Sequence, residues 1–220
     1  MKKLFFIALG MMTLSMAAQK DIEEGVITSK QTMSSDNEQM NAQLAMLGDM
    51  TTTTYFKNDK SRSETNHPMA GTTVFIADNS ANKSIIFMDN AMMGKKYVEG
   101  SVQPSEEDLK NIKVDKTTEK KNILGYDCTK YNISMVKDGA DVKMTVYATD
   151  TLKAITQQTA NFGDKFTGFP LLMNFAVEQQ GMKLDLNIEV TDIKAEKISD
   201  DKFDMTPPEG YSKTENLPGM

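Results

Sequence analysis

Apolar and polar residues alternate one by one along much of the chain, which is typical of β-strands with one buried and one solvated face. The clearest run is 182–190, where every second residue is apolar and the residues between are polar or charged. A second run, 142–148, follows the turn signal Asp138-Gly139 and predicts a hairpin with 131–136. The alternation therefore predicts an antiparallel sheet with one face toward a core.

Further strands are indicated by β-branched and aromatic residues between turn residues. The threonine tract at 51–54 leads into Tyr55-Phe56, which favours a strand over low-complexity sequence. The other strand candidates are residues 25–33, 72–77, 84–88, 95–99 and 114–120.

Two short helices are expected between the strands. Met40, Leu44 and Leu47 recur at helical spacing after capping side chains at 35–37, and Gly48 can end that helix. The second helix begins at Ser105, and acidic residues fill its first turn, where the helix dipole favours them.

The most apolar stretch beyond the N-terminal region is 166–175. Gly168 and Pro170 interrupt it, so a lid, a bent strand and a buried loop all fit the pattern.

Residues 1–18 are expected to be a signal peptide. Two lysines precede a short apolar run, 4–12, and small residues follow it, so cleavage after Ala17 or after Ala18 fits. The alternative, a buried N-terminal helix, agrees poorly with the abrupt change to polar residues at Gln19. No cysteine near the cleavage point could carry a lipid anchor, and no later segment is apolar enough to span a membrane. We therefore expect a periplasmic or secreted protein.

Composition narrows the classes of function. The chain has 25 lysines and arginines against 31 acidic residues, a formal charge of -6, which disfavours nucleic acid as a partner. One cysteine and one histidine exclude an intramolecular disulfide framework and a multi-cysteine or multi-histidine metal centre. No nucleotide-binding, nucleophile-elbow or zinc-protease motif occurs. We expect no enzyme, no cofactor and no metal, and a single domain over residues 19–220.

Three segments carry a family resemblance: Ile-Leu-Gly-Tyr-Asp-Cys-Thr-Lys-Tyr at 123–131, Val-Tyr-Ala-Thr-Asp at 146–150 and Pro-Pro-Glu-Gly-Tyr at 207–211. Together they resemble a family of exported bacterial proteins related to the LolA-like lipoprotein carriers. The resemblance implies an α+β fold dominated by β, in which a curved antiparallel half-barrel sheet carries a helix-and-loop lid. In the carriers, the apolar space under the lid receives acyl chains.

No single residue of the sequence points to a catalytic or metal-binding role. Cys128 is expected to be buried in a strand, because a lone exposed thiol would couple to others in an oxidising compartment. His67 lies in a predicted turn without a second histidine or cysteine to support catalysis or metal binding. Methionine is unusually abundant, with 18 residues, and suits either ordinary core filling or an adaptable apolar ligand surface. A copper site is disfavoured because no repeated methionine array appears.

The candidate ligand-binding residues are apolar and come from two sources. The strands supply Met144, Val146, Leu184 and Leu186, and the pieces expected to cover the concave side supply Met40, Leu44, Leu47, Leu171, Leu172 and Phe175. The leading hypothesis is a soluble exported binding protein that holds a lipid, a lipoprotein acyl chain or another apolar ligand. The alternative is a cell-envelope interaction or structural module with a filled interior, whose partner is an envelope protein. Under the first hypothesis, Leu44→Asp or Leu172→Asp should weaken uptake of a fluorescent fatty acid.

Overall fold

The computed structural model describes residues 21–67, 71–91, 93–137, 140–179 and 182–215. Within these residues the chain forms one twelve-stranded sheet in the order β12-β6-β5-β4-β3-β2-β1-β11-β10-β9-β8-β7. The strands are β1 (Glu24–Ser35), β2 (Met50–Lys57), β3 (Lys60–His67), β4 (Gly71–Asp78), β5 (Lys83–Asn90), β6 (Gly94–Gly100), β7 (Ile112–Ile123), β8 (Tyr126–Lys137), β9 (Ala140–Thr149), β10 (Phe169–Gln179), β11 (Met182–Lys194) and β12 (Ser212–Lys213). Among these strands, β12 alone pairs in parallel, with β6, and Ile22 and Leu152 form an isolated parallel bridge.

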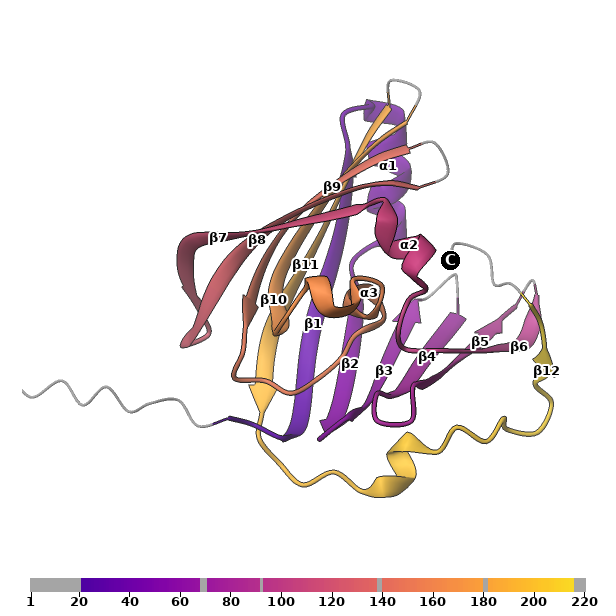
Figure 1. Ribbon diagram of the computed structural model, residues 1–220. Helices are drawn as coiled ribbons and strands as arrows, with labels where there is room; N and C mark the ends of the chain where they lie inside the picture. The colour runs from indigo at the N-terminus through magenta and orange to yellow at the C-terminus, as the bar shows by residue number, and fades with distance from the viewer. Residues whose placement is uncertain (1–20, 68–70, 92, 138–139, 180–181, 216–220) are drawn as a thin grey trace, which may run out of the picture.

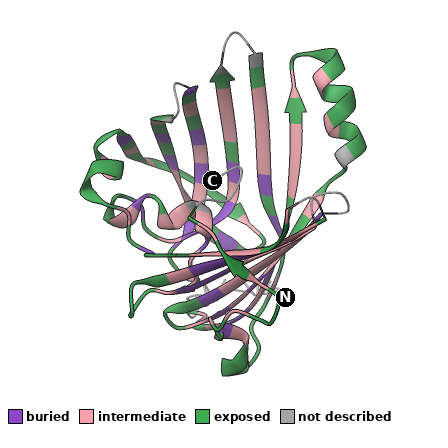
Figure 2. Cartoon of the chain, turned by 90° about the vertical axis from the view of Figure 1, so that its right-hand side faces the viewer, coloured by how far each residue is buried: buried purple, intermediate pink, exposed green. Residues whose placement is uncertain are grey.

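The helices are short. They are α1 (Glu38–Leu47), α2 (Glu106–Lys110), α3 (Gln157–Ala160) and the 3-10 helices η1 (Gly163–Lys165) and η2 (Asp200–Phe203). The sheet is open and strongly curved, with β7 to β11 on one side of β1 and β2 to β6 on the other (Figure 1). The helices α2 and α3 lie in the hollow between the two halves, and the view in Figure 2 shows these halves at a steep angle to each other. The expected fold class, a strand-dominated curved antiparallel sheet with few helices, is confirmed.

The period-two pattern located the strands well. The run at 182–190 lies in β11, and the predicted hairpin is β8 with β9, in which Tyr131 lies opposite Val146. Its Asp138-Gly139 turn lies outside the described residues. Met144 and Val146 point to the side of the sheet that holds a buried apolar cluster, which we call the inner face.

Irregular register accompanies the curvature. The pairing shifts between Thr28 and Ser29 in β1, between Pro170 and Leu172 in β10, and between Lys116 and Lys120 in β7. Such bulges bend a strand and increase its twist, and they tolerate a proline, which cannot donate to the sheet. They therefore help this sheet to wrap around a covering element.

The expectation that segment 171–175 covers the concave side of the sheet is wrong. The segment belongs to β10, where it pairs with both β9 and β11. Its apolar character reflects a central strand that is largely buried, and Gly168 and Pro170 mark the start of that strand rather than a break within a lid.

The helix α1 forms where the sequence predicted it. The Asn37 side chain accepts a hydrogen bond from the Met40 amide at 3.0 Å, and Gly48 follows the last turn with a φ of 73°. The helix packs against β1, and none of its described side chains joins a core cluster. The expectation that this helix covers the concave side stays a prediction, because its contacts are with β1 and include no core cluster.

The chain covers the outer face of one half of the sheet with its C-terminal segment, residues 195–211. Ile198 and Phe203 of this segment pack on Ile76, Ile85 and Phe87. Tyr211 completes the cluster, with its ring edge-on to Phe87 at a centroid distance of 5.5 Å. The C-terminal segment thereby buries Ile76, Ile85 and Phe87 on the outer face of the half formed by β2 to β6.

Candidate functional site

The inner face of the half formed by β7 to β11 is apolar across all five strands. Tyr131, Ile133, Met144, Val146, Met173 and Ile188 form its buried part. Phe162 and Phe166 complete this cluster from outside the sheet, and the Phe166 ring lies 4.9 Å from that of Tyr131. These two rings come from residues 150–168, the segment between β9 and β10, which we call the lid.

The lid also covers the other half of the sheet. Ile155 and Ala160 pack on a second inner-face cluster that contains Phe75, Ala77 and Ile86. One irregular segment thus fills the concave sides of both halves, and its α3 and η1 helices lie in the hollow (Figure 1).

Few hydrogen bonds fasten the lid to the rest of the protein. The Ser61 hydroxyl donates to the Ile155 carbonyl at 2.7 Å, and the hydroxyls of Tyr131 and Thr167 lie 3.1 Å apart. The Lys165 ammonium donates to two carbonyl oxygens at the end of α2 and the start of β7, those of Leu109 and Ile112, at 2.6 and 2.8 Å. At the other end, the Ile22 amide donates to the Thr151 carbonyl at 2.9 Å.

The lid has its own local structure. Thr156 and Thr159 form a capping box at the start of α3, which satisfies two amides of this single turn. Gly168 ends the lid with a φ of +89°, and a Cβ there would lie 2.7 Å from the Thr149 carbonyl oxygen. Only glycine fits this position without strain, so the geometry of the lid exit depends on it.

A small cavity of about 70 Å³ remains between the lid and the sheet. Hydroxyl and amide side chains of β1 to β4 line one side, and Phe169, Met173 and Ile188 line the other. Two hydroxyl pairs span neighbouring strands, Thr52 with Thr65 at 2.7 Å and Thr54 with Ser63 at 2.9 Å. No ionisable side chain lines this cavity among the described residues, so its polarity is that of neutral groups.

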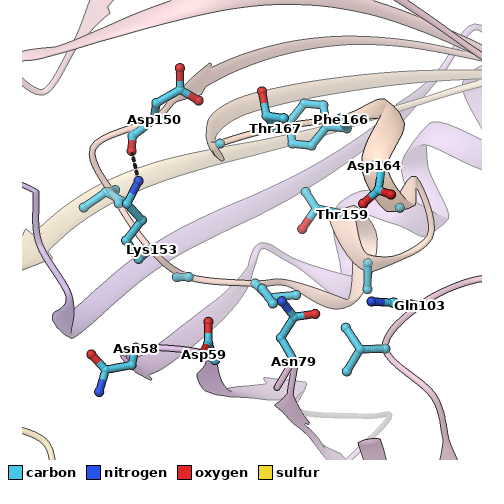
Figure 3. A pocket seen from close by; sticks show the side chains of 17 residues that line it. Asn58, Asp59, Asn79, Gln103, Asp150, Lys153, Thr159, Asp164, Phe166 and Thr167 are labelled. Atoms are coloured by element: carbon cyan, nitrogen blue, oxygen red, sulfur yellow. Dashed lines mark hydrogen bonds between the residues drawn. The ribbon is translucent and has the colours of Figure 1, made fainter. Parts of the chain in front are cut away.

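A larger pocket of about 560 Å³ opens at the base of the lid (Figure 3). Lid residues form one wall, and Asn58, Asp59, Asn79 and Gln103 from the sheet loops form the other. The Lys153 ammonium donates to the Asp150 carbonyl oxygen at 3.0 Å. Among the described residues no three acidic, histidine or cysteine side chains are grouped to hold a metal ion. This pocket offers a polar entrance beside the lid.

A family model described as a domain of unknown function (DUF4412) matches residues 24–211. The chain belongs to this family. The match spans the sheet, the lid and the C-terminal segment, so the elements described above are those of the family domain.

No curated protein matches the domain significantly. A solved structure described as PNGF-II is 15% identical, with a TM-score of 0.48. That match covers 87% of this chain but only 31% of the other, so the domain spans about a third of that protein. A putative outer membrane lipoprotein-sorting protein domain from Vibrio parahaemolyticus is 10% identical, with a TM-score of 0.33, and the match covers 84% of this chain and 91% of that one. In the described part of the domain, no helix is long and apolar enough to cross a membrane.

The structure distributes the ten candidate ligand residues over three places. Met144, Val146, Phe175, Leu184 and Leu186 share the inner face, as their register shows. Leu171 is fully buried at the β10 bulge, whereas Leu172 lies opposite Tyr147 and Glu189 on the outer face. Met40 and Leu44 are half-buried on α1, and the Leu47 side chain lies outside the described residues.

The sequence did not single out Phe162, and it included Phe166 only as the start of the apolar stretch 166–175, of which 166–168 belong to the lid and the rest to β10. Phe162 and Phe166 stand four residues apart beside Gly163, a spacing that alone indicates a short helical turn rather than the cover of a sheet. The sequence shows the hydroxyl side of the cavity only as a threonine tract, and the prediction that this tract forms a strand is confirmed by β2. Which face each threonine takes follows from the register of β2 with β1 and β3.

The two single reactive residues are both buried. Cys128 has no exposed surface, as predicted, and burial raises the pKa of its thiol to about 11. The prediction that His67 lies in a turn is wrong, because it is the last residue of β3, with 8% of its surface exposed. Neither residue lines the lid cavity or the pocket at its base.

Proposed function

We propose that this domain is an exported binding protein, related to the LolA-like carriers, that holds an amphipathic molecule with an acyl chain on its concave face. The observation that carries the proposal is that two phenylalanine side chains of the lid cover the apolar inner face. Phe162 and Phe166 sit on the inner face as side chains of a separate segment, and make the apolar contacts that an acyl chain would make. Binding exchanges these contacts for those of the ligand as the lid moves aside.

The lid has to move because the space under the closed lid is too small for an acyl chain. A cavity of about 70 Å³ has room for roughly two water molecules, at about 30 Å³ each in the liquid. Burying two phenylalanine side chains stabilises the closed lid by about 3 to 6 kcal/mol. An acyl chain gains about 0.8 kcal/mol per buried methylene, so roughly four to eight methylenes offset the loss of the two rings.

The apolar surface extends beyond the lid toward the rim of the sheet. Met135, Val142, Phe175 and Leu186 pack at the edge of the inner cluster and are only half-buried. Met33 and Leu184 lie on the same face further out, and are half-buried as well. This rim supports the proposal because it gives a chain a surface on which to dock before the lid opens.

The hydroxyl side of the cavity specifies the polar end of the ligand. A charged head group would be buried there without a counter-charge, which costs several kcal/mol. Ester, amide or hydroxyl groups can instead exchange hydrogen bonds with the threonines and serines of β2 and β3. The proposed ligand class is therefore an acylated molecule with a neutral head group.

Equilibrium binding of a fluorescent monoacylglycerol tests this function. The native domain should bind it, and should bind a fluorescent fatty acid of equal length more weakly. Phe166→Ala should bind about tenfold more tightly, because it lowers the free energy needed to open the lid. Phe203→Ala is the matched control, since it removes a buried ring from the outer-face cluster and should leave the affinity unchanged.

Two outcomes would contradict the proposal. If the native domain and Phe166→Ala both bind no monoacylglycerol, the filled interior is permanent and the alternative, an envelope interaction module, is favoured. If Phe166→Ala and Phe203→Ala change the affinity equally, the lid does not compete with the ligand.

A further inference from the structure

The outer face of the half formed by β7 to β11 carries a groove of about 640 Å³. Its lining comes mainly from positions 32 and 34, 132 and 134, 143 and 145, 174 and 176, and 185 and 187. These positions alternate with Met144 and Leu186 of the inner face, so the groove lies on the side of the sheet opposite the lid. The C-terminal segment packs on the outer face of the other half, on β4 and β5.

One row of directly opposed residues crosses six neighbouring strands in this groove. The row, which we call the amide row, consists of Asp115, Asn132, Thr145, Asn174, Asn187 and Thr32. Neighbouring strands lie about 4.8 Å apart, so the row is about 24 Å long. It presents one carboxylate, three carboxamides and two hydroxyls, one on each strand.

The asparagines of the amide row are not there to stabilise the sheet. Asparagine is depleted in strands because it packs poorly on a pleated surface, yet three of four consecutive strands carry it here in register. Asn132 and Asn174 are exposed, and Asn187 is half-buried. Within the described residues, none of these three carboxamides forms a hydrogen bond with another group of the protein. Each therefore offers two donors and one acceptor to a ligand.

The charges around the row do not form an anion site. Asp115 pairs with Lys113 at 3.1 Å, and Asp185 pairs with Lys183 at 3.0 Å. Among the described residues that line the groove, Lys143 is the one basic residue, and Asp115 and Asp185 are the acidic ones. The ammonium groups of Lys113 and Lys183 thus balance the two carboxylates, and the lining adds one further positive charge, so the groove holds no cluster of cations for a phosphate or sulfate polymer and fits an uncharged ligand better.

An aromatic ring stands next to the amide row on the same face. Tyr147 follows Thr145 by two residues on β9, which places both side chains on one side of the strand. Its hydroxyl donates to Glu119 at 2.6 Å, so the ring is held in place, half-buried, at the border of the row. The ammonium groups of Lys121 and Lys130 lie 5.5 and 6.0 Å from the centroid of this ring, so the ring borders the row without offering a free face for stacking.

We propose that the amide row is a binding site for an uncharged linear oligosaccharide. Hydroxyls of successive sugar units donate hydrogen bonds to, and accept them from, the carboxamides and hydroxyls that the row presents on neighbouring strands. The site lies on the opposite face from the lid and does not depend on the function proposed above.

Calorimetric titration of the native domain with cellohexaose, maltohexaose and chitohexaose tests the site. At least one of these should bind, and the double variant Asn174→Ala/Asn187→Ala should weaken that binding at least tenfold. Both substitutions are on a solvated strand face, so the fold should be retained. The matched control is Asn122→Ala, an exposed asparagine on β7 outside the groove, which should leave the affinity within twofold.

The lid variant Phe166→Ala should also leave oligosaccharide binding unchanged, because it acts on the inner face. Three results would overturn the proposal: no binding of any of the three hexasaccharides, equal binding by the double variant, or tighter binding of the acidic polymer polygalacturonate than of the neutral chains.

Discussion

At the scale of single residues, Cys128 links burial to a measurable pH dependence. Its thiol is fully buried, and the pKa rises from an ordinary value of 9.0 to about 11 because burial disfavours the thiolate. A raised pKa means that the folded state prefers the neutral thiol. This contribution to stability is complete below pH 9 and is lost as the pH rises toward 11.

We expect the free energy of unfolding to fall by about 2 to 3 kcal/mol between pH 8 and pH 11 through this thiol. Urea unfolding of the native domain against Cys128→Ala measures it, because the variant shares every other titrating group. The difference between the two proteins should shrink as the pH rises. Parallel curves across this range would show that the thiol does not titrate with folding.

Phe175 and Leu172 offer a second comparison at this scale, since they lie on opposite faces of β10. Phe175→Asp should weaken monoacylglycerol binding at least tenfold, because it places a charge on the half-buried apolar rim. Leu172→Asp should leave the affinity within twofold, because that side chain is on the outer face. Fluorescence titration of both variants, with circular dichroism to confirm folding, checks this. Equal losses would place the ligand away from the inner face.

At the scale of elements, the lid depends on its exit at Gly168. A Cβ at this position is strained by its φ of +89° and by the nearby Thr149 carbonyl. Gly168→Ala should lower the free energy of unfolding by about 1 to 3 kcal/mol, and Gly94→Ala, which also has a positive φ but open space around it, should cost less. Urea unfolding of the two variants makes the comparison. A Gly168→Ala cost no larger than that of Gly94→Ala would show that the exit is not constrained.

The elements also show what the sequence could and could not predict. Alternation at 182–190 and the capping residues before α1 are local signals, and both elements formed as expected. The apolar run at 171–175 could not be assigned from its local sequence, because a buried central strand and a lid have similar composition.

The lid and the amide row depend on contacts between distant parts of the chain. Ser61 donates a hydrogen bond to Ile155, 94 residues away in the sequence, and the hydrophobic pattern cannot predict such a contact. The amide row requires the register of six strands, which bulges shift at several points, so Asn132, Asn174 and Asn187 could not be aligned from sequence alone.

At the scale of the whole molecule, the curved sheet separates two surfaces of different chemistry. The concave side is apolar on one half and rich in hydroxyls on the other, and one segment covers both. The outer side is covered by the C-terminal segment on one half and carries a polar groove on the other. The edge strand β7 is rich in lysine, a feature that discourages pairing with the edge of another sheet.

The central claim is that lid and ligand compete for the inner face, and hydrogen exchange read by mass spectrometry tests it most directly. With saturating fluorescent monoacylglycerol, amides of residues 155–166 should exchange faster, while those of β8 to β11 should stay protected or become more so. Unchanged or slower exchange of residues 155–166 in the presence of the monoacylglycerol would contradict the claim.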